Sequence, residues 1–229
     1  MAFFALATFL VMLATLYFIP SMPVKERLSY GSQLAVLKKP LVWASIATVI
    51  FLNGSIFGVF NYLAEYLGAV SGVAPALVSI LLFAYGLCNI FGSMLAGNLL
   101  TVRPIFTAKA FPFAVAAIYL ALLGGGSAWP FMGLVVLLWG ILAGINGNIN
   151  QYWISHAAPE APDFANGLFL TAANLGCVFG TTISGKFIDG LGMEFVVLGG
   201  LLFCGLSAAV IFLQCSGAKS PVGAVENCA

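Results

Sequence analysis

Long apolar runs are the feature that most constrains what this chain can fold into. They match the ~20 residues that an α-helix needs to cross a ~30 Å hydrocarbon core. A membrane β-barrel would instead need segments of about ten residues with alternating polarity. We place seven runs, at residues 2–19, 41–67, 76–97, 105–123, 131–154, 165–188 and 195–214.

The composition leaves no alternative to a membrane protein. Hydrophobic residues make up 62% of the chain and charged residues 7%, against about 25% charged in soluble domains. The sequence therefore predicts an all-α integral membrane protein with the lipid bilayer as its partner. A net charge of +1 gives no reason to expect a nucleic-acid partner.

The polar chemistry needed for a metal site or a catalytic site is missing from the runs. The five cysteines show no CxxC or Cys/His spacing, so we interpret them as packing residues or free thiols. The runs also hold no cluster of His, Asp and Glu side chains near midplane. We expect no metal, no cofactor and no enzymatic activity.

Lys and Arg predict the orientation, because cytoplasmic loops are enriched in them. If the chain crosses seven times, one side carries Lys25, Arg27, Lys38, Lys39, Arg103, Lys109 and Lys219, and the other side only Lys186. The basic side is then cytoplasmic, as is the C-terminus. By parity the N-terminus lies outside.

This parity suggests the domain organisation. An outside start at residue 2 without a preceding charged region is typical of a helix that follows another helix. We expect residues 1–19 to be the last transmembrane helix of an N-terminal half absent from this sequence. Residues 20–40 would form a basic cytoplasmic linker with a short amphipathic surface helix, residues 41–215 a six-helix bundle, and residues 216–229 a cytoplasmic tail.

Asparagines mark a candidate solute site, because carboxamides are costly in hydrocarbon unless their hydrogen bonds are answered. At ~1.5 Å per residue, three from different runs lie near midplane and two lie towards the cytoplasmic side. They are Asn53, Asn89 and Asn174, followed by Asn146 and Asn150. The three runs 2–19, 105–123 and 195–214 have no carboxamide in their interiors. We predict an aqueous cavity lined by the other four runs; the alternative is that each asparagine only joins two helices.

The stretch GINGNINQYW divides its amides between two faces. At 100° per residue, Asn146 and Asn150 lie about 40° apart, whereas Asn148 and Gln151 point the other way. We expect the first pair to face the cavity and the second pair to bond a neighbouring helix or reach the interface. Trp153 would mark the headgroup zone.

Charged residues at the ends of the runs are candidates for gating or interfacial roles. Glu65 is expected at or beyond the outer interface, at the mouth of the cavity. Lys186 and Asp189 are three residues apart and can pair on one helix face. The small residues around Gly176 and Gly180 fit either close helix packing or a flexing cavity helix.

Three stretches carry a resemblance to a known family. They are LAVLKKPLVWASIATVIF, LCNIFGSMLAGNLL and APEAPDFANGLFLTAANLGCVFGTTISGKFIDGLGMEFV, the last with an N-L-G-x-x-x-G pattern from Asn174 to Gly180. The chain resembles the C-terminal half of a major facilitator superfamily transporter, preceded by the last helix of the N-terminal half. Within the superfamily it is most similar to the drug:proton antiporter branch, in particular to bacterial arabinose-efflux-type permeases.

The resemblance implies a function and a location. It implies part of a secondary active transporter of the cell inner membrane that exports a sugar, nucleoside or drug-like solute by alternating access. The same four runs would line its central cavity, and proton coupling would reside in the other half. The family's cytoplasmic loop motif is degenerate here, because Thr101 stands where Asp belongs and Arg103 comes one place late. Arg103 is therefore expected to be an interfacial anchor only.

Two other readings remain open. The chain could be a non-transporting truncated fragment, or a half-transporter that pairs with a second copy. A seven-helix receptor fits the parity, but a retinal protein needs a lysine deep in a helix, usually the last, and residues 195–214 contain none.

Overall fold

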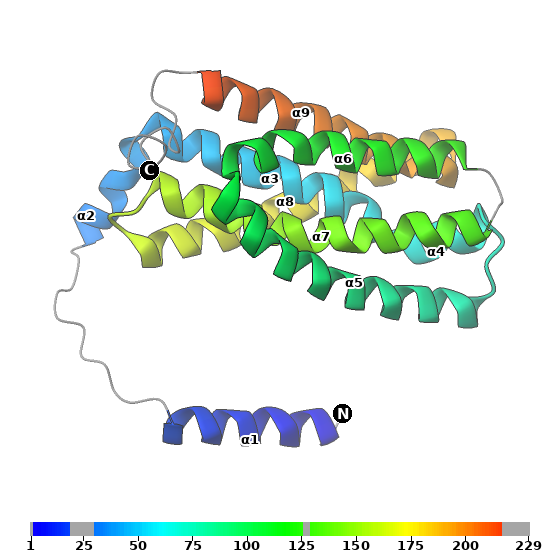
Figure 1. The fold of residues 1–229 in the computed structure, drawn as a ribbon, viewed down its shortest axis with the longest axis horizontal. Coiled ribbons are helices and arrows are strands. Elements are labelled where there is room, and N and C mark those ends of the chain that lie inside the picture. The colour runs from blue at the N-terminus through cyan, green and yellow to red at the C-terminus, as the bar shows by residue number, and fades with distance from the viewer. Residues whose placement is uncertain (1, 19–29, 126–128, 217–229) are drawn as a thin grey trace.

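The computed structural model describes residues 2–18, 30–125 and 129–216, and every regular element within them is helical (Figure 1). Six helices are long and apolar enough to cross a membrane. They are α3 (Pro40–Phe60), α5 (Pro75–Val102), α6 (Pro104–Gly124), α7 (Trp129–Ala157), α8 (Pro162–Leu191) and α9 (Val196–Ser216). The predicted all-α membrane fold is confirmed.

The first apolar run forms a separate helix. α1 (Ala2–Phe18) has 17 residues, which corresponds to a length of about 26 Å. Figure 1 shows it apart from the other helices, and large side chains such as Leu16 and Phe18 are exposed. Within this chain, α1 therefore has an apolar surface that the six-helix bundle does not cover.

Proline fixes where most of the spanning helices begin. Four of them start with Pro at the first helical position: Pro40, Pro75, Pro104 and Pro162. Proline suits this position because its missing N–H would have no partner inside the helix. At the far end of α8, Gly192 has a φ of 108°, a conformation that glycine adopts without steric cost.

The predicted single run over residues 41–67 is two helices, which corrects the sequence analysis. α3 ends at Phe60, and a short α4 (Leu63–Ala69) follows. At the break, Asn61 Nδ2 donates to Thr181 Oγ1 at 2.7 Å and the Tyr62 hydroxyl donates to the Thr181 carbonyl at 3.3 Å. The chain changes direction at this break, where it contacts α8. The length of the apolar run alone does not reveal this change.

α3 lies at the centre of the packing. It packs against α8, α9 and α7, while α5 packs against α7 and α6 against α9 (Figure 1). Glycine permits the closest approaches. A Cβ added at Gly58 would lie 2.8 Å from the Gly180 carbonyl, and one at Gly144 would lie 2.7 Å from the Ser93 nitrogen. Close packing therefore explains Gly180 without invoking a flexing helix.

An aromatic cluster joins four helices. Trp139 on α7 is fully buried, and its ring centroid lies 6.3 Å from Phe60, 5.8 Å from Tyr85 and 5.5 Å from Tyr119. The Tyr119 hydroxyl also donates to the Ser55 carbonyl at 2.5 Å. Because these residues come from α3, α5, α6 and α7, the cluster fixes the relative positions of the helices around the candidate site.

The end of the linker is docked onto the bundle. α2 (Tyr30–Ala35) and the 3-10 turn η1 (Val36–Lys38) precede α3. Val36 is buried in a cluster with Val42, Ala157 and Ala161, at the junction of α7 and α8. The segment thus packs against protein at Val36, although a surface helix was predicted. Linker residues 20–29 and tail residues 217–229 lie outside the described residues.

Candidate functional site

Asn53 and Asn146 meet across the α3–α7 interface. The Asn146 Nδ2 donates to Asn53 Oδ1 at 3.2 Å, and both side chains are buried. Asn53 also donates to the Val49 carbonyl one turn away, at 3.1 Å. The two amides therefore link the helices, with the Asn146 oxygen left without a hydrogen-bond partner in the described part of the chain.

Asn150 follows one turn further along α7 and is completely buried. Neither its amide nitrogen nor its amide oxygen has a hydrogen-bond partner among the described residues. The buried Ser45 hydroxyl on α3 is in the same condition. A buried amide without partners costs roughly 1–3 kcal/mol in stability, so Asn150 is a candidate to hydrogen-bond a water or a polar ligand.

Asn148 and Gln151 lie on the other side of α7, as predicted from the helical angles. Asn148 Nδ2 donates to the Gly144 carbonyl of its own helix at 3.0 Å, and Gln151 is exposed. The hydrogen bond from α7 to a neighbouring helix is instead made by Asn146, which donates to Asn53 of α3 from the face predicted to line the cavity. Trp153 lies four residues before the end of α7; it is buried and donates from Nε1 to Gln214 of α9, so it packs against protein there.

Asn174 and Asn89 lie on the two least buried spanning helices, α8 and α5. Asn174 is exposed, and its Nδ2 donates to the Leu170 carbonyl at 2.7 Å. Asn89 is half-buried, and its backbone carbonyl oxygen lies against Gly144 of α7. The five candidate asparagines thus form a buried group of three and two outer residues, rather than one ring.

Three polar side chains lie on the exposed face of α8, among exposed apolar ones such as Leu175 and Val178. Thr171, Asn174 and Thr182 are all exposed and fall within about 80° of one another around the helix axis. Thr171 donates to the Gly167 carbonyl at 2.9 Å and Thr182 to the Val178 carbonyl at 2.8 Å. We call these three residues the α8 polar stripe; sequence reasoning found Asn174 but not the two threonines with it.

The outward faces of α6 and α9 provide the contrast. Within the described side chains of these two helices, every exposed one is apolar or glycine, including Phe106, Leu120, Leu206 and Leu213. Such faces suit hydrocarbon, whereas an exposed amide such as that of Asn174 on α8 does not. The bundle therefore has a lipid-like side at α6 and α9 and a different side at α8.

The candidate gating residues lie at helix ends. Arg103 is exposed at the junction between α5 and α6, and the predicted loop before it is helical as far as Val102. Glu65 is exposed on α4, not at the end of a long spanning helix. Lys186 and Asp189 are both exposed, and no ion pair joins them.

The ion pair found in the described residues was not predicted. Lys39 Nζ lies 2.5 Å from Glu160 Oε1, joining the start of α3 to the turn between α7 and α8. The hydrogen bond from Lys39 lowers the pKa of the Glu160 carboxyl below its ordinary value of 4.5. Both side chains are more than two-fifths exposed, so solvent screens the pair. Among the same residues, His, Cys, Asp and Glu form no group of three that could hold a metal ion.

Comparison with known proteins decides the family. The model of the Major Facilitator Superfamily matches residues 1–181. The chain belongs to this superfamily. The resemblance to this superfamily drawn from the sequence is confirmed.

Three relatives of this Major Facilitator protein come from bacteria. It is 31% identical over 194 residues to the transcription regulatory protein OpdE of Pseudomonas aeruginosa, covering 82% of the chain and 47% of the relative. It is 26% identical over 218 residues to the inner membrane transport protein YdhP of Escherichia coli, covering 92% and 54%. It is 25% identical over 187 residues to a probable sugar efflux transporter of Pasteurella multocida, covering 81% and 46%. The chain spans about half the length of the curated relatives it matches.

Proposed function

We propose that the chain forms one half of a secondary active transporter that exports a small organic solute across the cell inner membrane by alternating access. The observation that supports this proposal most directly is the α8 polar stripe, which lies on a helix long and apolar enough to span a membrane. The two threonine hydroxyls bond carbonyls of their own helix, but the exposed Asn174 amide is costly against lipid and favours a water-filled pathway or a partner half. Two halves that rock about such a site are the usual architecture of secondary transporters.

The asparagines would then have two tasks. Asn174 and Asn89 would contact the solute from the open faces of α8 and α5. Asn53 and Asn146 would hold α3 against α7, and Asn150 would offer its free amide when that interface opens during the cycle. A pathway lined by amides and hydroxyls suits a neutral, hydroxylated solute such as a sugar or nucleoside, and relatives named as sugar efflux transporters favour a sugar.

Coupling to protons would come from outside this bundle. The described carboxylates Glu65, Glu160, Asp163, Asp189 and Glu194 all lie at helix ends or in connections. A proton-coupled transporter needs a group that titrates within the pathway. We therefore assign coupling to an N-terminal half that would contain α1, with a second copy of the chain as the alternative partner. The C-terminus would be cytoplasmic, and Arg103, Lys186 and Asp189 would sit at the interfaces, with Glu65 at the outer mouth.

Efflux of labelled solutes tests the proposal. Cells that produce the protein with its N-terminal half are loaded with labelled sugars and nucleosides, and the loss of label is followed with and without a pH gradient. Asn174→Ala and Thr182→Val should slow export of the transported solute at least tenfold, while Leu213→Ala on α9 should leave it unchanged. Export that survives both stripe substitutions at normal surface expression would contradict the assignment of α8 to the pathway.

A further inference from the structure

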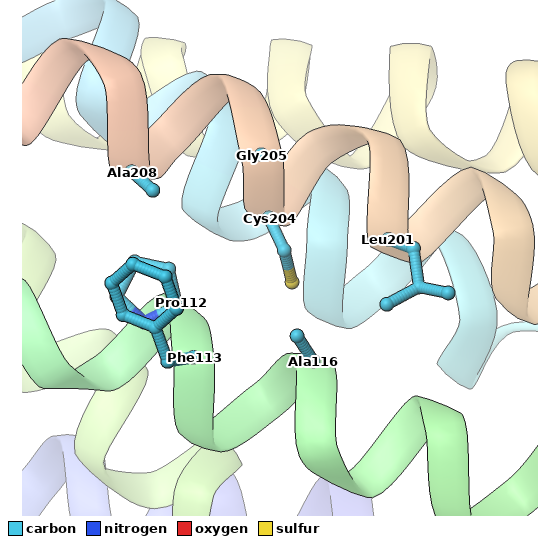
Figure 2. Close-up of a pocket in the computed structure, with 7 residues that line it drawn as sticks. All are labelled: Pro112, Phe113, Ala116, Leu201, Cys204, Gly205 and Ala208. Atoms are coloured by element: carbon cyan, nitrogen blue, oxygen red, sulfur yellow. The ribbon is translucent and has the colours of Figure 1, made fainter.

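A small pocket lies on the opposite side of the bundle from the proposed pathway. It has a volume of about 170 Å³ and lies between α6 and α9. α6 contributes Pro112, Phe113 and Ala116. α9 contributes Leu201, Cys204, Gly205 and Ala208, and Figure 2 shows the Cys204 side chain pointing from α9 towards Ala116 on α6.

Residue size explains why the two helices leave a space here. Ala116, Gly205 and Ala208 are too small to fill the gap between α6 and α9. An added Cβ at Gly205 would meet no atom within 4 Å. The lining is apolar apart from the Cys204 thiol, so the pocket suits a hydrocarbon chain better than a hydrated solute.

A lysine stands beside this pocket. Lys109 Nζ lies 5.7 Å from the centre of the Phe212 ring, within the range of a cation–π contact. The Phe212 ring in turn packs edge-on against Phe113, which lines the pocket, with centroids 6.1 Å apart. The cation is thus connected to the apolar pocket through two aromatic side chains in edge-on contact.

Lys109 also lies at the right depth and has no competing anion. It is five residues into α6, about 8 Å from the helix start, at the end of the bundle where Lys38, Lys39 and Arg103 lie. Among the described residues, no carboxylate lies within ion-pair distance of it. A half-buried lysine below the headgroups and beside an apolar groove has the pattern of a lipid headgroup site.

We propose that this face binds an anionic phospholipid of the leaflet at the basic end. The lipid phosphate pairs with Lys109, and one acyl chain occupies the pocket between α6 and α9. Charge selects the headgroup, because none of the carboxylates among the described residues pairs with Lys109. The outward faces of both helices are apolar, so the pocket opens to the bilayer and its occupant arrives from there. This site is independent of the solute pathway on α5 and α8.

Native mass spectrometry of the whole chain in detergent tests the proposal. Phosphatidylglycerol and phosphatidylcholine with identical acyl chains are titrated separately, and phosphatidylglycerol should bind more tightly. Lys109→Gln should weaken phosphatidylglycerol about fivefold and leave phosphatidylcholine unchanged, because one lysine near an anionic headgroup contributes about that factor. Lys109→Arg should retain the preference, and Lys186→Gln at the other end should not alter it.

A second pair of variants tests the pocket. A Cβ added at Gly205 meets no atom within 4 Å, so Gly205→Leu should occupy the pocket and weaken both lipids. Gly97→Leu, at an equally open glycine of α5, should weaken neither. A phosphatidylglycerol carrying a photoreactive acyl chain should label peptides around Phe113 and Ala208. Equal affinity for the two lipids would overturn the proposal, as would labelling confined to α5 and α8. A dimer that Gly205→Leu dissociates would also overturn it, because this face would then be a contact between two copies of the chain.

Discussion

Asn146 of α7 donates a hydrogen bond to Asn53 of α3, and both side chains are buried where the two helices cross. Residues 93 positions apart are thereby joined at the middle of the bundle. Such a bond between membrane helices contributes on average ~0.6 kcal/mol, up to about 1.7 kcal/mol.

A double-mutant cycle should measure this bond. Asn53→Ala and Asn146→Ala should each lower the free energy of unfolding, and the pair should show a coupling energy of about 0.6–1.7 kcal/mol. Unfolding of the purified protein by a denaturing detergent supplies the measurement. Asn174→Ala is the reference, because Asn174 bonds only within its own helix and should change stability little. A coupling energy of zero would show that the two amides act independently.

Asn150→Leu should stabilise the fold and slow transport. The amide is completely buried without partners, so an apolar side chain of similar size removes a penalty of roughly 1–3 kcal/mol. Thermal unfolding gives the first quantity and solute efflux the second. The companion variant Asn146→Leu should destabilise, since it removes the donor to Asn53. Destabilisation by Asn150→Leu would mean that the amide has a partner, such as a bound water.

Gly58→Ala should destabilise the α3–α8 contact by about 1–3 kcal/mol, because its Cβ would lie 2.8 Å from the Gly180 carbonyl. Gly167→Ala on α8 is the matched control, since its Cβ meets no atom within 4 Å. That substitution should instead raise stability by about 0.5–1 kcal/mol through the better helix propensity of alanine. Melting temperatures in one detergent compare the two directly; a change of the same sign in both would argue against close packing.

Glu160→Gln should matter only at pH values where the carboxylate is charged. Its folded-state pKa lies below the ordinary value of 4.5, so the bond to Lys39 stabilises the fold above that pH. The contribution disappears as the pH falls below 4.5 and the folded carboxyl takes up a proton. Unfolding temperatures should therefore differ slightly between wild type and variant at pH 7 in low salt and converge at pH 3 or in 1 M salt. Equal differences at both pH values would exclude the ion pair as their cause.

The spanning helices and their faces were accessible from sequence because they depend on local properties. Apolar length placed six spans, and the prolines at positions 40, 75, 104 and 162 mark helix starts within a few residues of those predicted. The angle of 100° per residue also separated Asn146 and Asn150 from Asn148 and Gln151 correctly. It could not tell whether the first pair meets water or another helix, because that depends on where α3 lies.

What sequence reasoning missed depends on contacts between distant residues. The break after Phe60 occurs in a stretch without Pro or Gly at the break itself, and it accompanies the bonds of Asn61 and Tyr62 to Thr181. The sequence placed Trp153 near a helix end, but did not show that its indole is buried and bonded to Gln214 of α9. Likewise the pairing of Lys39 with Glu160 joins residues far apart in the sequence, and nothing local to either residue indicates it.

The docking of η1 limits how far α1 can lie from the six-helix bundle. Val36 is buried, the Trp43 indole donates to the Leu37 carbonyl at 2.8 Å, and Lys39 pairs with Glu160, so the chain is anchored to the bundle just before α3. Only residues 19–29 separate α1 from the first described residue of this anchored segment. Fully extended, they can cover at most about 40 Å. Any helices that pack against α1 must therefore lie within about 40 Å of the basic end of the bundle. This distance limits how an N-terminal half or a second copy can be arranged around the bundle.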